Sequence, residues 1–147
     1  MIDTTFLIMA FVTMFVVIDP IGLAPLFVAL TQGMSASAKR KIAFRSCAIA
    51  IVLLVVFALL GEAVLEFIGI SMAAFRIAGG ILLFITALDM LFERRTKRRE
   101  DTADDEDHSD DPSVFPLAIP LIAGPGAIAS VILLTGQRPG AEGLVMV

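Results

Sequence analysis

Four long apolar segments constrain the fold of this chain more than any other feature. They run from Phe6 to Leu30, from Cys47 to Leu60 with a continuation to Ile68 that contains Glu62 and Glu66, from Ile70 to Phe92 and from Val114 to Thr135. A helix needs about 20 apolar residues to cross the roughly 30 Å hydrocarbon core of a bilayer, and each segment is about that long. The sequence therefore predicts an all-α, polytopic bundle of transmembrane helices.

Composition and the placement of charge support the same class of protein. Hydrophobic residues make up 58% of the chain and charged residues 18%, whereas soluble domains have roughly 45–50% and about 25%. Nine of the 11 Lys and Arg residues fall in two short stretches, 39–45 and 94–99, between apolar segments. Because no basic face is interleaved with aromatic residues, we expect a lipid bilayer and not a nucleic acid as the partner.

The charges of the connections predict an orientation. Basic residues crowd the connections 31–46 and 93–113, while the connection around Glu62 and Glu66 has no Lys or Arg. Under the positive-inside rule, loops 31–46 and 93–113 are cytoplasmic and the N-terminus lies outside.

A charged linker divides the chain into three parts. Residues 1–92 form a first unit of three spans, residues 93–113 a cytoplasmic linker, and residues 114–147 the start of a second unit that ends early. The acidic tract 100–111 is too highly charged to bury a core. Cys47 stands alone and His108 lies in the acidic tract, so we expect neither a metal site nor a cofactor.

The first and fourth apolar segments are each interrupted by residues that break helices. Pro20 and Pro25 interrupt the first, and Pro120 and Pro125 interrupt the fourth. Each proline lacks an N–H, so in the first segment the carbonyls of Val16 and Ile21 lose their helical partners. Such groups cost several kcal/mol each in lipid, so irregular backbone is tolerated only against protein or a watery cavity.

The two interrupted segments look like copies of each other. Pro20 pairs with Pro120, and Pro25 with Pro125, at the same spacing of 100 residues. By the predicted topology the two copies cross the membrane in opposite directions, as in an inverted repeat. If the repeat is three plus three spans, this chain lacks the last two; the alternative is that the fourth span closes a bundle with an even number of spans. Paired interruptions of this kind indicate the midplane site of a transporter. The alternative is that these residues only kink helices or let them pack closely.

Broken helices offer groups that suit both ends of a zwitterion. Half-helix N-termini present N–H donors to a carboxylate, and unwound carbonyls accept from an ammonium group or a cation. Glycines let a ligand approach the backbone, so small amino acids are a natural substrate class. The candidate substrate-binding residues are Asp19, Pro20, Gly22, Pro25, Pro120, Gly124, Pro125 and Gly126.

Three charged residues lie inside apolar segments, where charge indicates a functional role by default. Asp19 is near the middle of its span, and Arg76 is about 7 Å to the outer side of the centre of the third span, so the two could pair. Asp89 lies close to the cytoplasmic end. Asp19 either couples transport to a proton or cation or caps the second half-helix. Arg76 is a structural partner, a snorkelling side chain or a substrate ligand.

Small residues in the third span suit close helix packing. Ala74 and Ala78 stand four apart, and Gly79 and Gly80 follow directly. Small residues at this spacing let helix backbones approach one another. We interpret these four residues as a packing surface and not as ligands.

Three motifs resemble one known family. They are "IDPIGLAPLFVALT" in the first span, "FRIAGGILLFITALDML" in the third and "PLAIPLIAGPGAI" at the start of the fourth. In this order they resemble the MarC family of bacterial inner-membrane proteins, whose members typically have six spans. The resemblance implies an inner (plasma) membrane location and a link to small neutral amino-acid transporters. The motif positions that carry over are Asp19, Pro20, Gly22, Pro25, Arg76, Gly79, Gly80, Pro120, Gly124, Pro125 and Gly126.

The leading functional hypothesis is a secondary transporter of small neutral amino acids or similar metabolites, driven by H⁺ or Na⁺. A non-transporting membrane scaffold is the alternative, with the charged linker recruiting partners. We do not expect an enzyme, because the spans contain no His, no Ser/His pair and no paired carboxylates. The sequence does not specify an oligomeric state.

Overall fold

The computed structural model describes residues 3–92, 112–137 and 147, and every regular element in these residues is helical. The elements are α1 (Thr4–Ile18), α2 (Pro20–Leu30), α3 (Ala36–Phe67), α4 (Met72–Leu91), η1 (Ser113–Ile122) and α6 (Pro125–Gln137). No strand occurs within the described ranges. The prediction of an all-α membrane protein is confirmed at this level.

Within these ranges the chain contains three or four candidate membrane spans. The segment Thr4–Leu30 (α1 with α2), α3 and α4 are each long and apolar enough to cross a bilayer. The segments η1 and α6, which are bent by 55° relative to each other, make a fourth if they are taken together. These spans follow the four apolar segments of the sequence. Residues 93–111 of the predicted linker, including His108, lie outside the described residues.

Side-chain caps fix where the long helices begin. Ser35 Oγ accepts from the Ala38 N–H at 3.3 Å, and Ser71 Oγ accepts from the Ala74 N–H at 3.2 Å. A capping hydroxyl satisfies an N–H that has no partner within the helix. Because Ser35 caps α3, this helix begins well before Cys47, where the predicted span starts, and so includes most of the predicted connection 31–46.

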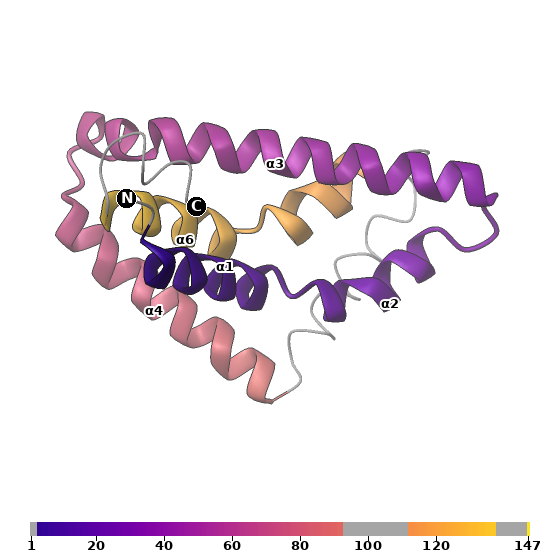
Figure 1. Ribbon diagram of the computed structural model, residues 1–147, viewed down its shortest axis with the longest axis horizontal. Coiled ribbons are helices and arrows are strands. Elements are labelled where there is room, and N and C mark those ends of the chain that lie inside the picture. Colours follow the sequence, from indigo (N-terminus) through magenta and orange to yellow (C-terminus); the bar gives the residue numbers. More distant parts are fainter. Residues whose placement is uncertain (1–2, 93–111, 138–146) are drawn as a thin grey trace.

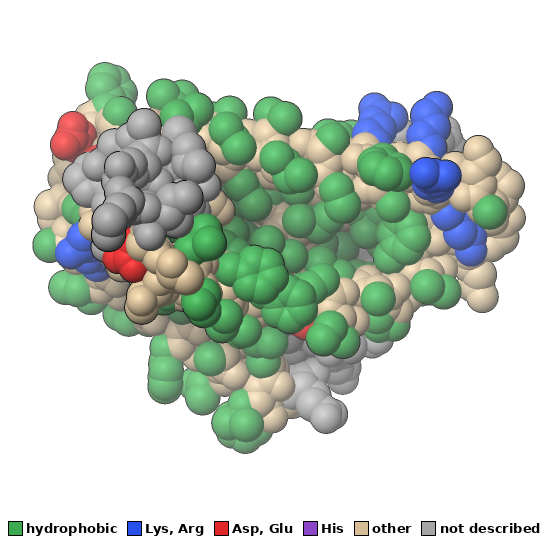
Figure 2. Space-filling view, in the orientation of Figure 1, with side chains coloured by type: hydrophobic (Ala, Val, Ile, Leu, Met, Phe, Trp, Pro, Cys, Tyr) green, Lys and Arg blue, Asp and Glu red, His purple; other side chains and the backbone are tan. Residues whose placement is uncertain are grey.

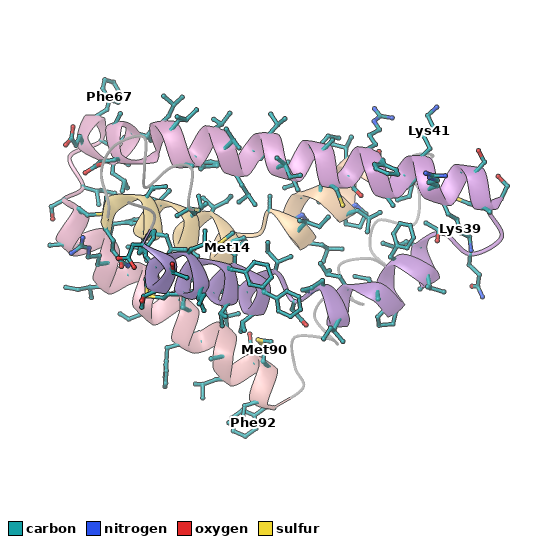
Figure 3. All side chains as sticks on the ribbon, viewed as in Figure 1. Met14, Lys39, Lys41, Phe67, Met90 and Phe92 are labelled. Atoms are coloured by element: carbon teal, nitrogen blue, oxygen red, sulfur yellow. The ribbon has the colours of Figure 1, made fainter. Side chains whose placement is uncertain are left out.

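The early start places basic residues on α3 itself. With 32 residues, α3 is about 48 Å long at 1.5 Å per residue, longer than the roughly 30 Å core of a bilayer. Lys39 and Lys41 lie near one end of this helix and Phe67 at the other (Figure 3). The surplus length allows the basic end to stand outside the hydrocarbon.

The segment η1–α6 forms the centre of the bundle. It runs between α3 on one side and α1 and α2 on the other, and α4 packs against α6 (Figure 1). Leu134 of α6 packs against Phe6 and Ala10 of α1, while Ile132 packs with Leu65 of α3. The core therefore lies around α6.

The outer faces of the bundle are apolar. Hydrophobic side chains cover most of the face seen in Figure 2, and Lys and Arg gather at the end of α3 that carries Lys39 and Lys41. Phe67 is 91% exposed, and Phe44 is 68% exposed. A soluble protein rarely exposes a contiguous apolar surface of this extent, and a bilayer or another apolar partner is the environment it suits.

Candidate functional site

The first helix break is centred on Asp19. Its backbone is left-handed, with φ 55° and ψ 64°, a conformation that Asp tolerates better than most residues. The Asp19 N–H donates to Phe15 O at 2.9 Å and so closes α1. Its Oδ1 accepts from the Gly22 N–H at 3.1 Å and so caps α2. Pro20, which has no N–H to lose, stands at the first position of α2.

The second break is centred on Ala123 and Gly124. Ala123 leaves the helical region with φ −88° and ψ 58°, and α6 begins at Pro125. The Ile128 N–H donates to Gly124 O at 3.0 Å, as the Leu23 N–H does to Asp19 O at 3.0 Å. Gly124 therefore occupies the position of Asp19.

The structure offers an alignment of the two breaks other than the spacing of 100 residues. Pro125 corresponds to Pro20 in that each is the first residue of its half-helix. Pro25 lies inside α2, which continues to Leu30. Pro120 lies inside η1, next to the extended residue Ile119 (φ −128°, ψ 127°).

At the second break, the backbone of Gly124 lies close to the backbone carbonyl of Pro120. A Cβ atom on Gly124 would lie 2.5 Å from the carbonyl oxygen of Pro120. Real Cβ atoms do not approach a backbone oxygen so closely, so only glycine fits here without a shift of the backbone. The glycine at this position is explained by the path of the chain between η1 and α6.

The two breaks adjoin each other. A Cβ atom on Gly126 would lie 3.3 Å from Val17 Cγ1, and Leu83 Cδ2 of α4 is the next nearest atom at 3.9 Å. Val17 precedes Asp19 by two residues, and Gly126 follows Gly124 by two. The tertiary structure thus brings the interrupted parts of the first and fourth apolar segments into contact.

Three helix ends meet where the breaks adjoin. The segments α1–α2 and η1–α6 run in opposite directions (Figure 1), so α2 and α6 both begin there and α1 ends there, whereas η1 is interrupted by the extended residues Phe115 and Ile119 and is not one continuous helix. Helix N-termini carry partial positive charge and C-termini partial negative charge. The junction therefore offers electrostatic partners for both signs of charge.

The two N-termini differ in how they are capped. Asp19 caps α2 through its carboxylate, but Gly124 has no side chain with which to cap α6. The first N–H groups of a helix have no acceptor within the helix. The backbone N–H groups of Gly126 and Ala127 therefore have no N-cap side chain as an acceptor.

Arg76 and Asp19 are not brought together. Asp19 ends the 15-residue helix α1, about 22 Å along its axis, whereas Arg76 lies in the second turn of α4 with an exposed side chain. Arg76 makes no ion pair with Asp19 in the described structure. The pairing considered from their positions in the sequence does not form.

The small residues of α4 fall into two groups. Gly79 is buried, and a Cβ atom there would lie 2.9 Å from Leu133 Cδ1 of α6. Gly80 has nothing within 4 Å of such an atom, and Ala74 and Ala78 are exposed. Gly79 is therefore the residue of this set at which α4 approaches α6.

Sequence reasoning did not single out Ser130 as a site residue. This side chain is 1% exposed, and its Oγ has no hydrogen-bond partner in the described structure. It stands one helical turn after Gly126 on the same face of α6, and helical side chains lean toward the N-terminus of their helix. The sequence pattern that could have identified Ser130 is a hydroxyl residue four positions after Gly126, the glycine at the second break.

The part of the chain that the structure describes contains no group of three or more His, Cys, Asp or Glu residues that could hold a metal ion. The only cysteine of the chain, Cys47, is exposed.

Comparison with known proteins identifies a family. A family model described as "MarC family integral membrane protein" matches residues 4–147. A UPF0056 membrane protein of Archaeoglobus fulgidus is 40% identical over 138 residues, which cover 90% of this chain and 63% of the relative. The UPF0056 inner membrane protein YhgN of Escherichia coli is 32% identical over 141 residues, which cover 96% of this chain and 70% of the relative.

The chain spans roughly two thirds of the length of the curated relatives it matches, with 59% of a UPF0056 relative from Methanocaldococcus jannaschii, 63% of the A. fulgidus protein and 70% of the E. coli protein covered. No solved structure matches it.

Proposed function

Because this chain belongs to the MarC family of integral membrane proteins, we propose that it forms part of a secondary transporter for small neutral amino acids or similarly small zwitterionic metabolites. The observation that carries the proposal is the contact between the two helix breaks, where Gly126 of α6 meets Val17 of α1. Breaks at midplane depth from two segments of opposite direction are the arrangement expected of a transporter site.

The carboxylate of the substrate binds at the N-terminus of α6. The amides of Gly126 and Ala127 have no side-chain cap there, and the positive end of the helix favours an anion. The N-terminus of α2 is a weaker candidate, because the Gly22 N–H already donates to Asp19 Oδ1 at 3.1 Å.

The ammonium group of the substrate lies toward the C-terminal end of α1. Helix C-termini carry partial negative charge, and the carboxylate of Asp19 stands directly after α1. Close approach of Gly126 to Val17 and of Gly124 to the Pro120 carbonyl leaves little space at the junction. This supports a substrate with a small side chain, such as glycine or alanine.

The topology that we propose has the N-terminus outside and the basic end of α3 in the cytoplasm, as the positive-inside rule predicts. Opposite directions of α1–α2 and η1–α6 (Figure 1) support an inverted repeat of three plus three spans, of which this chain supplies four. Asp19 is the residue available for coupling to H⁺ or Na⁺, in addition to its role as a cap.

Uptake by a full-length protein in liposomes tests the proposal. The protein used has the full length of its relatives, and labelled glycine and alanine are offered under imposed proton or sodium gradients. We expect accumulation of at least one substrate. If neither substrate moves under any gradient, the proposal is wrong.

A matched pair of variants tests the site. Gly126→Leu should abolish uptake without loss of membrane insertion, because the added side chain fills the junction beside Val17. Gly80→Leu is the control, since nothing lies within 4 Å of that position, and it should retain uptake. Equal uptake by both variants would mean that the breaks are only kinks.

A further inference from the structure

The basic residues of α3 lie at one edge of the membrane. Lys41 and Glu62 stand about 31 Å apart along this helix at 1.5 Å per residue, which matches the roughly 30 Å hydrocarbon core of a bilayer. Arg45 is the only charged residue between them. A bilayer that has Glu62 at one edge of its hydrocarbon therefore has Lys41 at the other, at the depth of the lipid headgroups.

Two of these basic residues lie on the side of α3 that faces away from the bundle. The buried side is marked by Ser46 and Ala50, which are 2% and 1% exposed. At about 100° per residue, Lys39 lies about 20° from Ser46 around the helix axis, whereas Arg40 and Lys41 lie about 120° and 140° from it. In Figure 3, Lys41 points away from the bundle and Lys39 points to the other side of α3. Lys39 is half-buried, while Arg40 and Lys41 are exposed, so these two are the ones that face lipid.

An aromatic ring accompanies Arg40 on this outer face. The guanidinium carbon of Arg40 lies 5.7 Å from the ring centroid of Phe44, and Phe44 is itself 68% exposed. A cation–π contact holds a cation in place without neutralising its charge. Neither Arg40 nor Lys41 forms an ion pair within the described residues. The outer face thus presents two neighbouring positive charges, and the exposed Arg45 adds a third one turn nearer the hydrocarbon.

An apolar surface continues from these charges towards the middle of the membrane. Ile51 and Val52 are each 61% exposed and Val55 is 48% exposed. All three lie on the same outer face of α3, about 120° or more from Ser46 around the axis. The face is therefore cationic at the depth of the headgroups and apolar at the depth of the acyl chains. A phospholipid has the complementary arrangement, with a phosphate at one end and hydrocarbon chains behind it.

We propose that Arg40 and Lys41 bind the phosphate of an anionic phospholipid headgroup. The acyl chains of this lipid lie along Ile51, Val52 and Val55. A guanidinium group suits phosphate because it donates two parallel N–H···O hydrogen bonds, and a lysine ammonium adds a point charge. Neighbouring positive charges favour a headgroup with net negative charge over a zwitterionic headgroup, whose own ammonium group they repel. The proposal concerns the lipid around the protein and does not depend on transport.

Quenching of a single tryptophan by brominated lipid tests the proposal. The chain has no native tryptophan, so Ile51→Trp supplies one reporter beside the site. Phe84→Trp on α4 is the matched reference, because Phe84 is 64% exposed and Ile51 61%. Each protein is reconstituted into phosphatidylcholine vesicles in which brominated phosphatidylglycerol or brominated phosphatidylcholine replaces a rising fraction of the lipid.

We expect brominated phosphatidylglycerol to quench Ile51→Trp at lower fractions than Phe84→Trp, and brominated phosphatidylcholine to quench both alike. Lys41→Gln should raise the fraction of phosphatidylglycerol needed at Ile51→Trp by about fivefold, the effect of one basic residue at an anionic surface. Lys39→Gln, which removes the same charge from the other side of α3, should leave this fraction unchanged. Equal quenching of the two reporters by phosphatidylglycerol overturns the proposal. Equal effects of the two lysine variants also overturn it, because net charge alone would then explain the attraction.

Further measurements separate other occupants of the site. Inorganic phosphate added to the vesicles should not reduce the quenching of Ile51→Trp, and displacement by it overturns the proposal because the site would then take free phosphate. The chain without residues 100–111 should show the same lipid preference. A preference that emerges only after this deletion overturns the proposal, because the acidic tract would then occupy the site. Lys41→Arg guards against misfolding of the variants: it keeps the charge and should keep the preference, and loss of the preference in this variant contradicts the proposal.

Discussion

Replacing Gly124 by alanine should destabilise the protein, whereas the same replacement at Gly80 should not. The Cβ atom of Gly124→Ala would lie 2.5 Å from the carbonyl oxygen of Pro120, and nothing lies within 4 Å of the equivalent atom at Gly80. The obstructing atom belongs to the backbone, so it cannot move away by a change of rotamer. The segment between η1 and α6 has to shift as a unit.

The expected magnitudes follow from these distances. Overpacking that forces a backbone shift costs about 1–3 kcal/mol. Removing a glycine from a helix interior where a methyl group fits gains about 0.5–1 kcal/mol, so Gly80→Ala should be slightly stabilising. Gly79→Ala should fall between the two, because its Cβ would meet Leu133 Cδ1 at 2.9 Å and that side chain can move.

Unfolding by SDS in mixed micelles measures these differences as free energies, with helix content followed by circular dichroism. Gly80→Ala serves as the control for any general effect of alanine. The order of stability should be Gly80→Ala, then Gly79→Ala, then Gly124→Ala. A Gly124→Ala protein as stable as Gly80→Ala would refute the reasoning that glycine is required by the path of the chain at the second break.

Other variants probe the first break, the packing of α3, the buried hydroxyl and the linker. Asp19→Ala should lose about 0.5–2 kcal/mol with the cap, while Asp19→Asn should keep the cap, and loss of gradient dependence in a stable Asp19→Asn protein would assign coupling to the carboxylate. Gly61→Ala should destabilise the α3–α6 contact because its Cβ would lie 2.5 Å from Ile132 Cγ1, and Ile132→Val should recover part of the loss in a double-mutant cycle. Ser130→Ala should leave stability equal or higher, because its buried Oγ has no partner, and reduced uptake at equal stability would make it a substrate ligand. Deleting residues 100–111 should preserve uptake if the protein is a transporter, and loss of phenotype with intact uptake would favour the scaffold alternative.

Local chemistry explains why much of the architecture could be predicted. Whether a segment spans a membrane depends on its own length and hydrophobicity, and the helices follow the four apolar segments. A proline removes an N–H wherever it stands, so interruptions near Pro20 and Pro125 were predictable. The capping role of Asp19, one of the two considered, is present in the structure.

Where a helix begins depends on the residues next to it as well as on the spacing of prolines or on hydrophobicity. Of the four prolines, Pro20 begins a half-helix after the left-handed residue Asp19, Pro125 begins one after Ala123 has left the helical region, and Ile119 directly before Pro120 is extended. Pro25 follows Ala24 and remains within α2. The start of α3 was likewise set by the Ser35 cap and not by hydrophobicity.

The sequence by itself determined that this is a membrane protein, which segments are apolar enough to span, and where the backbone of two of them is interrupted. Only the tertiary structure decided that the interruptions adjoin, that α6 lies at the centre, and that Arg76 is remote from Asp19. The physical reason is that these relations depend on close approach at Gly61, Gly79 and Gly126, where helices distant in sequence fit together by shape, and no local pattern specifies which glycine meets which side chain.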